Sequence, residues 1–341
     1  MAKATDGYTG DPKTTQLRSL ATNPLLPGLI DTHHHVIPPF LRQAMADSPH
    51  LSKGMRTPTW TPQTTLSFMA SNGIETSILS CALPLAVLAP ETPTKAATLA
   101  REVNDYLASL RTEHPTQIGF FASLPSLEDT KTCIEEIRYA LDDLHTDGVL
   151  LFTSYNSKYL GHPDFESVWA ELNARGAVVF THPTIEGAAE NCIQEPFTIP
   201  PPLLDWTHET SRAAMHLIRT NTPRRFPDCR IILSHGGGTL PFIAGRMADL
   251  QTRISGKSEE EFLEDARRFY FDIALVGPPV TPLQLVLEFA ESGHVLFGTD
   301  FPFVAAEGAA RRWEGVTVDG GENLVMETRN AAQVLFPRLR G

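Results

Sequence analysis

Cysteines are few in this sequence of 341 residues, and none of them stand close together. The four are Cys81, Cys133, Cys192 and Cys229. Their wide spacing argues against a zinc knuckle and against a disulfide framework, because both need cysteines in characteristic groups. We therefore expect a reduced chain in the cytoplasm.

Extended runs of lysine and arginine are also absent, and the formal net charge is −12. Nucleic-acid affinity depends on clustered basic side chains, so we expect no nucleic-acid partner. No apolar stretch approaches the roughly 20 residues that a membrane helix needs, so we expect no membrane partner. Residues 1–23 are polar and lack the apolar core of a secretory signal. We expect them to form a disordered or extended arm before a single domain at 24–341.

Two kinds of chemistry lack their signature motifs. No Gly-x-Ser-x-Gly sequence marks a serine nucleophile, and no P-loop marks a nucleotide-phosphate site. The run Gly236-Gly237-Gly238 has neither the spacing nor the trailing lysine of a P-loop. The sequence therefore gives no support to acyl-serine or nucleotide-phosphate chemistry.

Short apolar runs rich in valine, isoleucine and phenylalanine alternate with longer amphipathic stretches. This pattern is typical of repeated strand–helix units around a buried parallel sheet. We predict strands near residues 29–31, 74–80, 118–124, 148–152, 177–181, 231–234, 269–274 and 295–298. We predict helices at 95–113, 127–144, 164–175, 209–220, 241–254, 282–292 and 327–335, and a proline-rich active-site loop at 183–202. Eight strands with intervening helices indicate an α/β fold of the closed (β/α)8 type, a TIM barrel.

Histidine and aspartate gather where the predicted strands end. In a (β/α)8 barrel the active site lies at the carboxyl ends of the strands. Residues i and i+2 of a strand share a face, so His33 and His35 are expected to point into the barrel while His34 points away. Three further strands end at His182, His235 and Asp300.

Imidazole and carboxylate groups together suit Zn²⁺ or Mn²⁺. We expect one divalent metal ion per chain, with Zn²⁺ favoured and Mn²⁺ as the alternative. The expected ligands are His33, His35, His182 and Asp300. Such a set leaves coordination open for water, which is typical of catalytic sites. The fourth predicted strand ends in Phe152-Thr153, without a lysine that could be carbamylated to bridge two metal ions, so a binuclear site is disfavoured.

Several of these strand ends carry longer motifs. They are Ile30-Asp31-Thr32-His33-His34-His35-Val36-Ile37-Pro38, Thr181-His182-Pro183, Ser234-His235-Gly236-Gly237-Gly238 with Pro241, Gly245 and Arg246, and Gly298-Thr299-Asp300-Phe301-Pro302. Together they resemble the decarboxylase branch of the amidohydrolase superfamily. That branch includes aminocarboxymuconate semialdehyde decarboxylase and the fungal 6-methylsalicylate decarboxylases, and the resemblance extends through the whole barrel.

The resemblance implies roles for individual residues. It makes the four expected ligands the metal site and gives His235 and Asp300 catalytic roles. It also implies that Arg246 reaches the substrate carboxylate across the interface of a homodimer. Arg56, four residues before Trp60, is a second candidate for binding that carboxylate.

The leading functional prediction is non-oxidative decarboxylation of a small aromatic hydroxy acid. The resemblance narrows this to conversion of 6-methylsalicylate, a product of polyketide secondary metabolism, to 3-methylphenol and CO2. Decarboxylation of aminocarboxymuconate semialdehyde is an alternative substrate assignment. A hydrolase that uses a metal-activated water to open a lactone or amide, with His235 as base, stays open. A barrel that holds metal without catalysis is the third hypothesis.

Overall fold

The computed structural model describes residues 28–47, 57–83, 85, 93–184, 199–276, 280–303 and 324–340. Within these ranges, eight parallel strands form one sheet in the order β1-β2-β3-β4-β7-β8-β9-β10. The strands are β1 (Leu29–His35), β2 (Ile74–Ser80), β3 (Ile118–Ala122), β4 (Gly148–Phe152), β7 (Val178–His182), β8 (Arg230–Leu233), β9 (Tyr270–Asp272) and β10 (Val295–Leu296). A short antiparallel hairpin, β5 (Ser154–Tyr155) and β6 (Lys158–Tyr159), follows β4.

The sheet closes because the segment after β10 pairs with β1. The backbone N–H of Thr32 donates to the carbonyl of Phe297 at 2.9 Å. The N–H of His35 donates to the carbonyl of Phe301 at 2.7 Å, and His34 forms a parallel bridge with Phe301. The predicted (β/α)8 barrel is confirmed, and its closure places the end of β1 beside the segment that carries Asp300.

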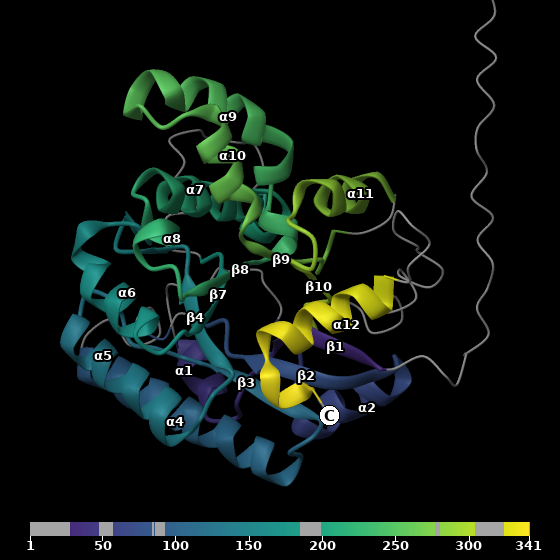
Figure 1. Cartoon of the computed structure of the whole chain (residues 1–341). Helices are drawn as coiled ribbons and strands as arrows, with labels where there is room; N and C mark the ends of the chain where they lie inside the picture. The colour runs from purple at the N-terminus through teal and green to yellow at the C-terminus, as the bar shows by residue number, and fades with distance from the viewer. Residues whose placement is uncertain are drawn as a thin grey trace, which may run out of the picture.

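Helices surround the strands (Figure 1). They are α1 (Leu41–Asp47), α2 (Pro62–Ser71), α4 (Pro93–Glu113), α5 (Thr130–Arg138), α6 (Glu166–Asn173), α7 (Asp205–Arg219), α8 (Thr222–Arg225), α9 (Leu240–Ser255), α10 (Glu259–Arg267), α11 (Val280–Phe289) and α12 (Leu324–Leu335). In Figure 1, α9 and α10 extend beyond the rest of the barrel. No helix among the described residues is both long enough and apolar enough to cross a membrane.

Some predicted boundaries are corrected. β9 and β10 are shorter than predicted because the chain leaves the regular ladder and turns with positive φ at Leu275 and Asp300. The helix predicted at 127–144 is α5 followed by a π-helical turn, Tyr139–Asp143. α10 was not predicted, although the side chains of Ser258 and Glu261 form a capping box at its start.

Two predictions fall on residues that the structure does not describe. The arm at 1–23 lies outside the described residues, and so does the part of the proline-rich loop at 185–198. The division between an arm and a single domain at residue 24 therefore stays a prediction.

The barrel interior beneath the strand ends is apolar. The rings of Phe121 and Phe180 stack with their centres 5.1 Å apart, and Phe180 lies 5.0 Å from the ring of His33. All three side chains are fully buried. The polar groups at the strand ends thus rest on a packed hydrophobic floor, which keeps water from reaching them from below.

Candidate active site

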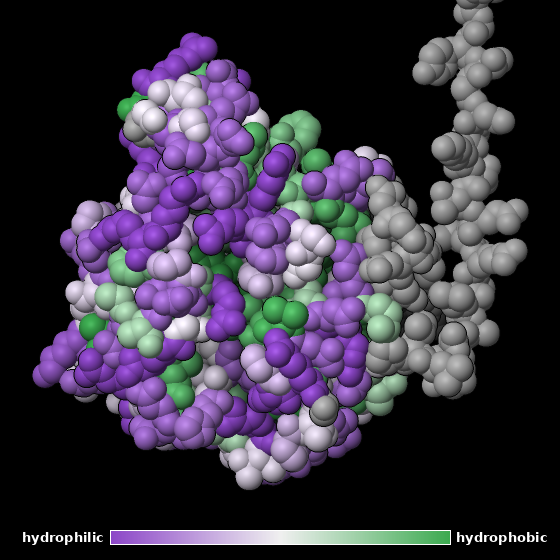
Figure 2. Space-filling view, in the orientation of Figure 1, coloured by the Kyte–Doolittle hydropathy of each residue, from purple (hydrophilic) through white to green (hydrophobic). Residues whose placement is uncertain are grey.

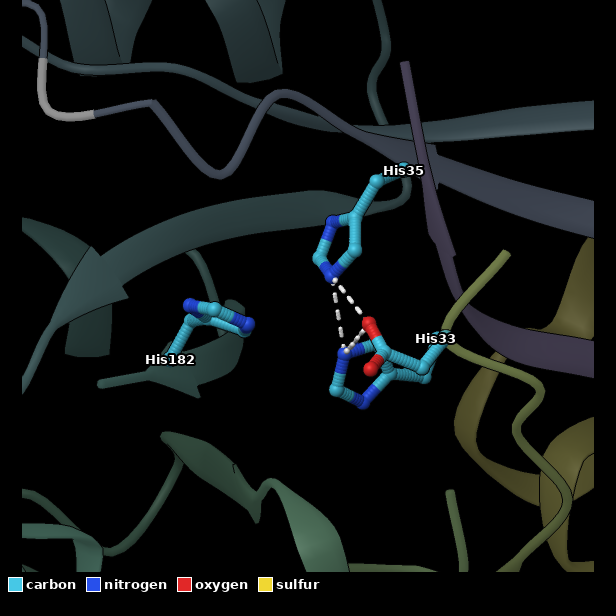
Figure 3. A group of neighbouring side chains, drawn as sticks. His33, His35 and His182 are labelled. Carbon is cyan, nitrogen blue, oxygen red and sulfur yellow. Dashed lines mark hydrogen bonds and ion pairs between the residues drawn. The ribbon is translucent and has the colours of Figure 1, made fainter. Parts of the chain in front are cut away.

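β1 distributes three consecutive histidines over its two faces. His33 and His35 point into the barrel (Figure 3). His34 points away, with Nδ1 2.9 Å from Oδ2 of Asp31 and Nε2 3.1 Å from Oγ1 of Thr65. The alternation expected of a strand is present, and His34 connects β1 to α2.

Four side chains of the kinds that bind metals converge at the mouth of the barrel. They are His33, His35, His182 and Asp300, and one ligand atom of each lies within 4.8 Å of the others. Nε2 of His33 lies 2.9 Å from Nε2 of His35, and Oδ1 of Asp300 lies 3.1 Å from the latter atom. Ligands held at about 2.0–2.1 Å around a tetrahedral zinc ion stand about 3.3 Å apart, so this donor set fits a divalent metal ion.

The four groups are buried and electrostatically coupled. Burial opposes protonation of His33, but Asp272 and Asp300 together outweigh it and raise its pKa to about 10. Burial lowers the pKa of His35 and that of His182. Burial by itself would raise the pKa of Asp300, yet hydrogen bonds from His33 and His35 hold it well below its usual range. Two neutral imidazoles and a carboxylate are the protonation states that metal coordination requires.

Asp272, at the end of β9, connects two parts of the site. Its Oδ2 accepts a hydrogen bond from Nδ1 of His33 at 3.0 Å. Its Oδ1 accepts from the backbone N–H groups of His235 at 3.2 Å and Ala274 at 3.0 Å. This arrangement leaves Nε2 of His33 facing His35 and Asp300. Asp272 was not among the residues predicted from the sequence, although a carboxylate within the apolar run Tyr270-Phe271-Asp272-Ile273 was a usable signal.

A second buried carboxylate fixes the segment that carries Asp300. Oδ2 of Asp31 accepts a hydrogen bond from Oγ1 of Thr299 at 2.6 Å, and its Oδ1 accepts from the backbone N–H of Thr299 at 3.1 Å. Asp300 follows with φ of 62°, a conformation that non-glycine residues adopt uncommonly. Asp31 therefore stabilises the turn that aims Asp300 at the histidines.

A turn of unusual conformation presents His235. His235 has φ of 55°, and the three glycines after it also have positive φ. A Cβ atom on Gly238 would lie 1.9 Å from the carbonyl oxygen of Thr207, so only glycine fits there. The His235 ring lies 4.7 Å from that of His33, and its Nδ1–H donates to the carbonyl of Ala274 at 3.2 Å. Burial lowers the pKa of His235.

A pocket of about 730 Å³ opens above the cluster and is lined partly by His35, His182, His235 and Asp300. Two aromatic side chains lie beside these polar residues. Phe303 lies 5.6 Å from the ring of His35, and Trp206 lies 5.7 Å from the ring of His182. The indole N–H of Trp206 has no hydrogen-bond partner within the described part of the chain. The pocket thus combines histidine and aspartate side chains of the kinds that bind metals with walls that suit a flat aromatic ring.

Neither of the two predicted arginines is among the described residues that line this pocket. Arg246 lies exposed on α9 and is absent from the described pocket lining of its own chain. Arg56 lies outside the described residues. At the end of β4, Phe152 and Thr153 are buried, and no lysine stands there.

A closed barrel of eight parallel strands, with a histidine–aspartate cluster at their carboxyl ends, defines the class of metal-dependent (β/α)8-barrel enzymes. Comparison of the sequence with known families places the chain more narrowly within this class. Residues 30–323 match the family model described as amidohydrolase, and the chain belongs to that family.

Named relatives add detail. The chain is 44% identical over 323 residues to Decarboxylase yanB of Aspergillus niger, covering 91% of this chain and 88% of that protein. It is 43% identical over 324 residues to the 6-methylsalicylic acid decarboxylase of Penicillium expansum, covering 92% and 97%. Its fold is similar to that of a dihydroxybenzoic acid decarboxylase from Polaromonas sp. with bound manganese and 2-nitroresorcinol, with a TM-score of 0.71, 20% identity and 93% and 98% coverage.

Proposed function

We propose that this protein is a metal-dependent, non-oxidative decarboxylase of small aromatic hydroxy acids. We propose 6-methylsalicylate as its substrate and 3-methylphenol and CO2 as its products. The observation that carries this proposal is the 43–44% identity, over 91–92% of the chain, to proteins named as decarboxylases, one of them for 6-methylsalicylic acid. The shape of the pocket supports the proposal. Its walls are apolar and partly aromatic, and its polar residues lie together at the bottom, so it suits a single ring whose polar groups point toward them.

The proposed ligands of the metal ion are His33, His35, His182 and Asp300, whose ligand atoms converge as described. We favour Zn²⁺ because three imidazoles and a carboxylate form a set typical of zinc, with Mn²⁺ as the alternative. The manganese in the dihydroxybenzoic acid decarboxylase of similar fold keeps that alternative open.

When bound by His33, His35, His182 and Asp300, the metal ion would supply Lewis-acid stabilisation of the negative charge that develops on the acid. Phe303 and Trp206 would position the ring and exclude water from it. The bond between the ring carbon and the carboxylate breaks, its electron pair stays on the ring carbon, and CO2 leaves. His235 takes up a proton from solvent on its Nε2 atom and delivers it to that carbon, with Asp300 as the alternative donor. The bond from Nδ1 of His235 to Ala274 keeps the imidazole oriented during this step.

Decarboxylation and hydrolysis place solvent atoms differently, so isotopes separate the two hypotheses. In deuterated water, we expect deuterium on the ring carbon that carried the carboxylate and CO2 in equal amount. In oxygen-labelled water, we expect no heavy oxygen in 3-methylphenol. Mass spectrometry and NMR of the product measure both. Incubation of 3-methylphenol itself with the enzyme is the control for exchange. Solvent oxygen in the organic product, with no CO2 from any salicylate, would favour the hydrolase.

We further propose a cytoplasmic homodimer in which Arg246 reaches the carboxylate bound by a second copy. Arg246 lies on α9 four residues after Phe242 and four before Leu250, and Ile254 continues the spacing. These three apolar side chains are 81%, 40% and 63% exposed. Residues four apart share a helix face, so α9 presents an apolar stripe with Arg246 inside it. Such a stripe favours contact with another copy.

The dimer proposal predicts complementation between two impaired variants. We expect Arg246→Ala to raise KM and His235→Ala to lower kcat by about 10²- to 10⁴-fold. Mixed dimers of the two should regain measurable activity, because one of their sites has both residues intact. Steady-state assays on dimers purified with two different tags measure this, and dimers of each variant alone are the controls. If verified mixed dimers regain nothing, Arg246 does not act across the interface.

A further inference from the structure

The pocket extends well beyond its polar residues His35, His182, His235 and Asp300. The rest of its described lining, called the outer part below, is mainly apolar. Among the described lining residues, the ionisable ones are His35, His182, His235 and Asp300, and no lysine or arginine occurs. The hydroxyl groups of two lining threonines are already engaged. Oγ1 of Thr207 donates to the carbonyl of Leu204 at 2.7 Å, and Oγ1 of Thr239 lies 2.8 Å from Oγ of Ser211. A polar group in this outer part would lose water and gain few partners.

The apolar lining residues form a path from His235 toward the surface, and their exposed fractions increase along it. A Cβ atom on Gly236, next to His235, would lie 2.9 Å from Cγ2 of Val276 and 3.1 Å from Cγ2 of Val286, so both valines pack against the catalytic turn. Val286 is 5% exposed, whereas Leu285 beside it is 37% exposed.

Two further leucines extend this path. Leu275 is 48% exposed, and Leu203, in the 3-10 turn Pro201–Leu203, is 74% exposed. Figure 2 shows apolar surface near α11, the helix that carries Leu285 and Val286. An apolar ligand that covered these side chains would remove their apolar surface from water, which is energetically favourable.

The volume of the pocket exceeds what one small ring needs. Its 730 Å³ lies in the upper part of the range of about 300–1,000 Å³ that holds drug-sized ligands. A methylsalicylate has one ring and three small substituents, so it leaves much of the outer pocket unfilled.

We propose that the enzyme accepts salicylates with ring alkyl chains longer than methyl and binds the chain in an alkyl subsite. We define the alkyl subsite as Leu203, Leu275, Val276, Leu285 and Val286. This inference rests on the proposed decarboxylase function and extends its substrate class to 6-alkylsalicylates, of which 6-methylsalicylate is the smallest. Each added methylene that leaves water for this path contributes about fourfold in affinity, at about 0.8 kcal/mol per methylene.

The test is a chain-length series on the metal-loaded enzyme. We expect kcat/KM to rise from 6-methyl- through 6-ethyl- and 6-propyl- to 6-pentylsalicylate by about fourfold per methylene at first, mainly through KM. Binding of the matching 3-alkylphenols, measured by calorimetry, should tighten in the same order. A fall in kcat/KM and in phenol affinity at every chain longer than methyl overturns the alkyl subsite and leaves the proposed function standing. Absence of CO2 from the whole series overturns both.

Two substitutions at exposed positions test the location of the chain. Leu203→Ser and Leu285→Ser should each lower the ratio of pentyl to methyl kcat/KM several-fold, because a serine hydroxyl replaces apolar contact area. Val334→Ser is the matched control, since Val334 is 54% exposed on α12 and does not line the pocket. Its ratio should equal that of the unchanged protein. An unchanged ratio in both leucine variants would place the chain elsewhere and overturn the assignment.

Discussion

The His235→Asn variant is expected to lose about 10²- to 10⁴-fold in kcat while it keeps its metal ion, because a general acid contributes about that factor. His235 is the histidine of the pocket that stands outside the proposed ligand set. Asparagine tolerates the positive φ of this position, and Asp272 binds the backbone N–H of residue 235 rather than its side chain. The turn should therefore survive the change.

Steady-state rates with 6-methylsalicylate and metal content by mass spectrometry measure this result. His145→Asn is a matched control, because His145 also has positive φ but is exposed and precedes β4, at the opposite end of the strands. We expect the control to keep both rate and metal. A His235→Asn variant within a few-fold of the unchanged protein would move the proton transfer to Asp300.

Loss of metal is the second large effect. The chain is expected to bind about one divalent ion, and His33→Ala and His182→Ala should each lose most of it together with nearly all activity. Each substitution removes one nitrogen from a compact set whose ligand atoms lie within 4.8 Å of one another. Metal content after dialysis and affinity in competition with a chelator measure this. Full activity without metal, or two ions per chain, would contradict the site.

Asp272→Asn provides a graded test of the same site. It keeps the size of the side chain that holds His33 and the backbone of His235, but it removes the negative charge. Groups that orient metal ligands typically contribute about 10- to 100-fold in metal affinity. We expect a weakening in that range, smaller than that of His33→Ala. Affinity equal to that of the unchanged protein would show that Asp272 only supports the fold.

The strands and the convergence of the histidine and aspartate side chains were accessible from sequence because they depend on local rules. Alternation within β1 separated His33 and His35 from His34, and the carboxyl ends of parallel strands meet at one opening. His182 and Asp300 could therefore be placed beside them without coordinates. The shortened ends of β9 and β10 and the existence of α10 were not predicted, because turn geometry and packing between helices depend on distant neighbours.

The roles of the two arginines could not be decided from the sequence. Nothing local distinguishes an arginine that faces solvent from one that reaches a second copy, so the exposed position of Arg246 leaves its role as a proposal. Arg56 lies outside the described residues, and its predicted role stays a prediction.

The sequence alone determined the barrel and the residues at the ends of its strands, because residue periodicity and chain direction set these features. Only the tertiary structure decided how those residues are held and what surrounds them. Asp272 meets His33 across 239 positions, and Asp31 meets Thr299 across 268, contacts that exist only once the sheet closes. The apolar pocket likewise combines side chains from separate loops and helices, and such a surface forms only when the whole chain packs.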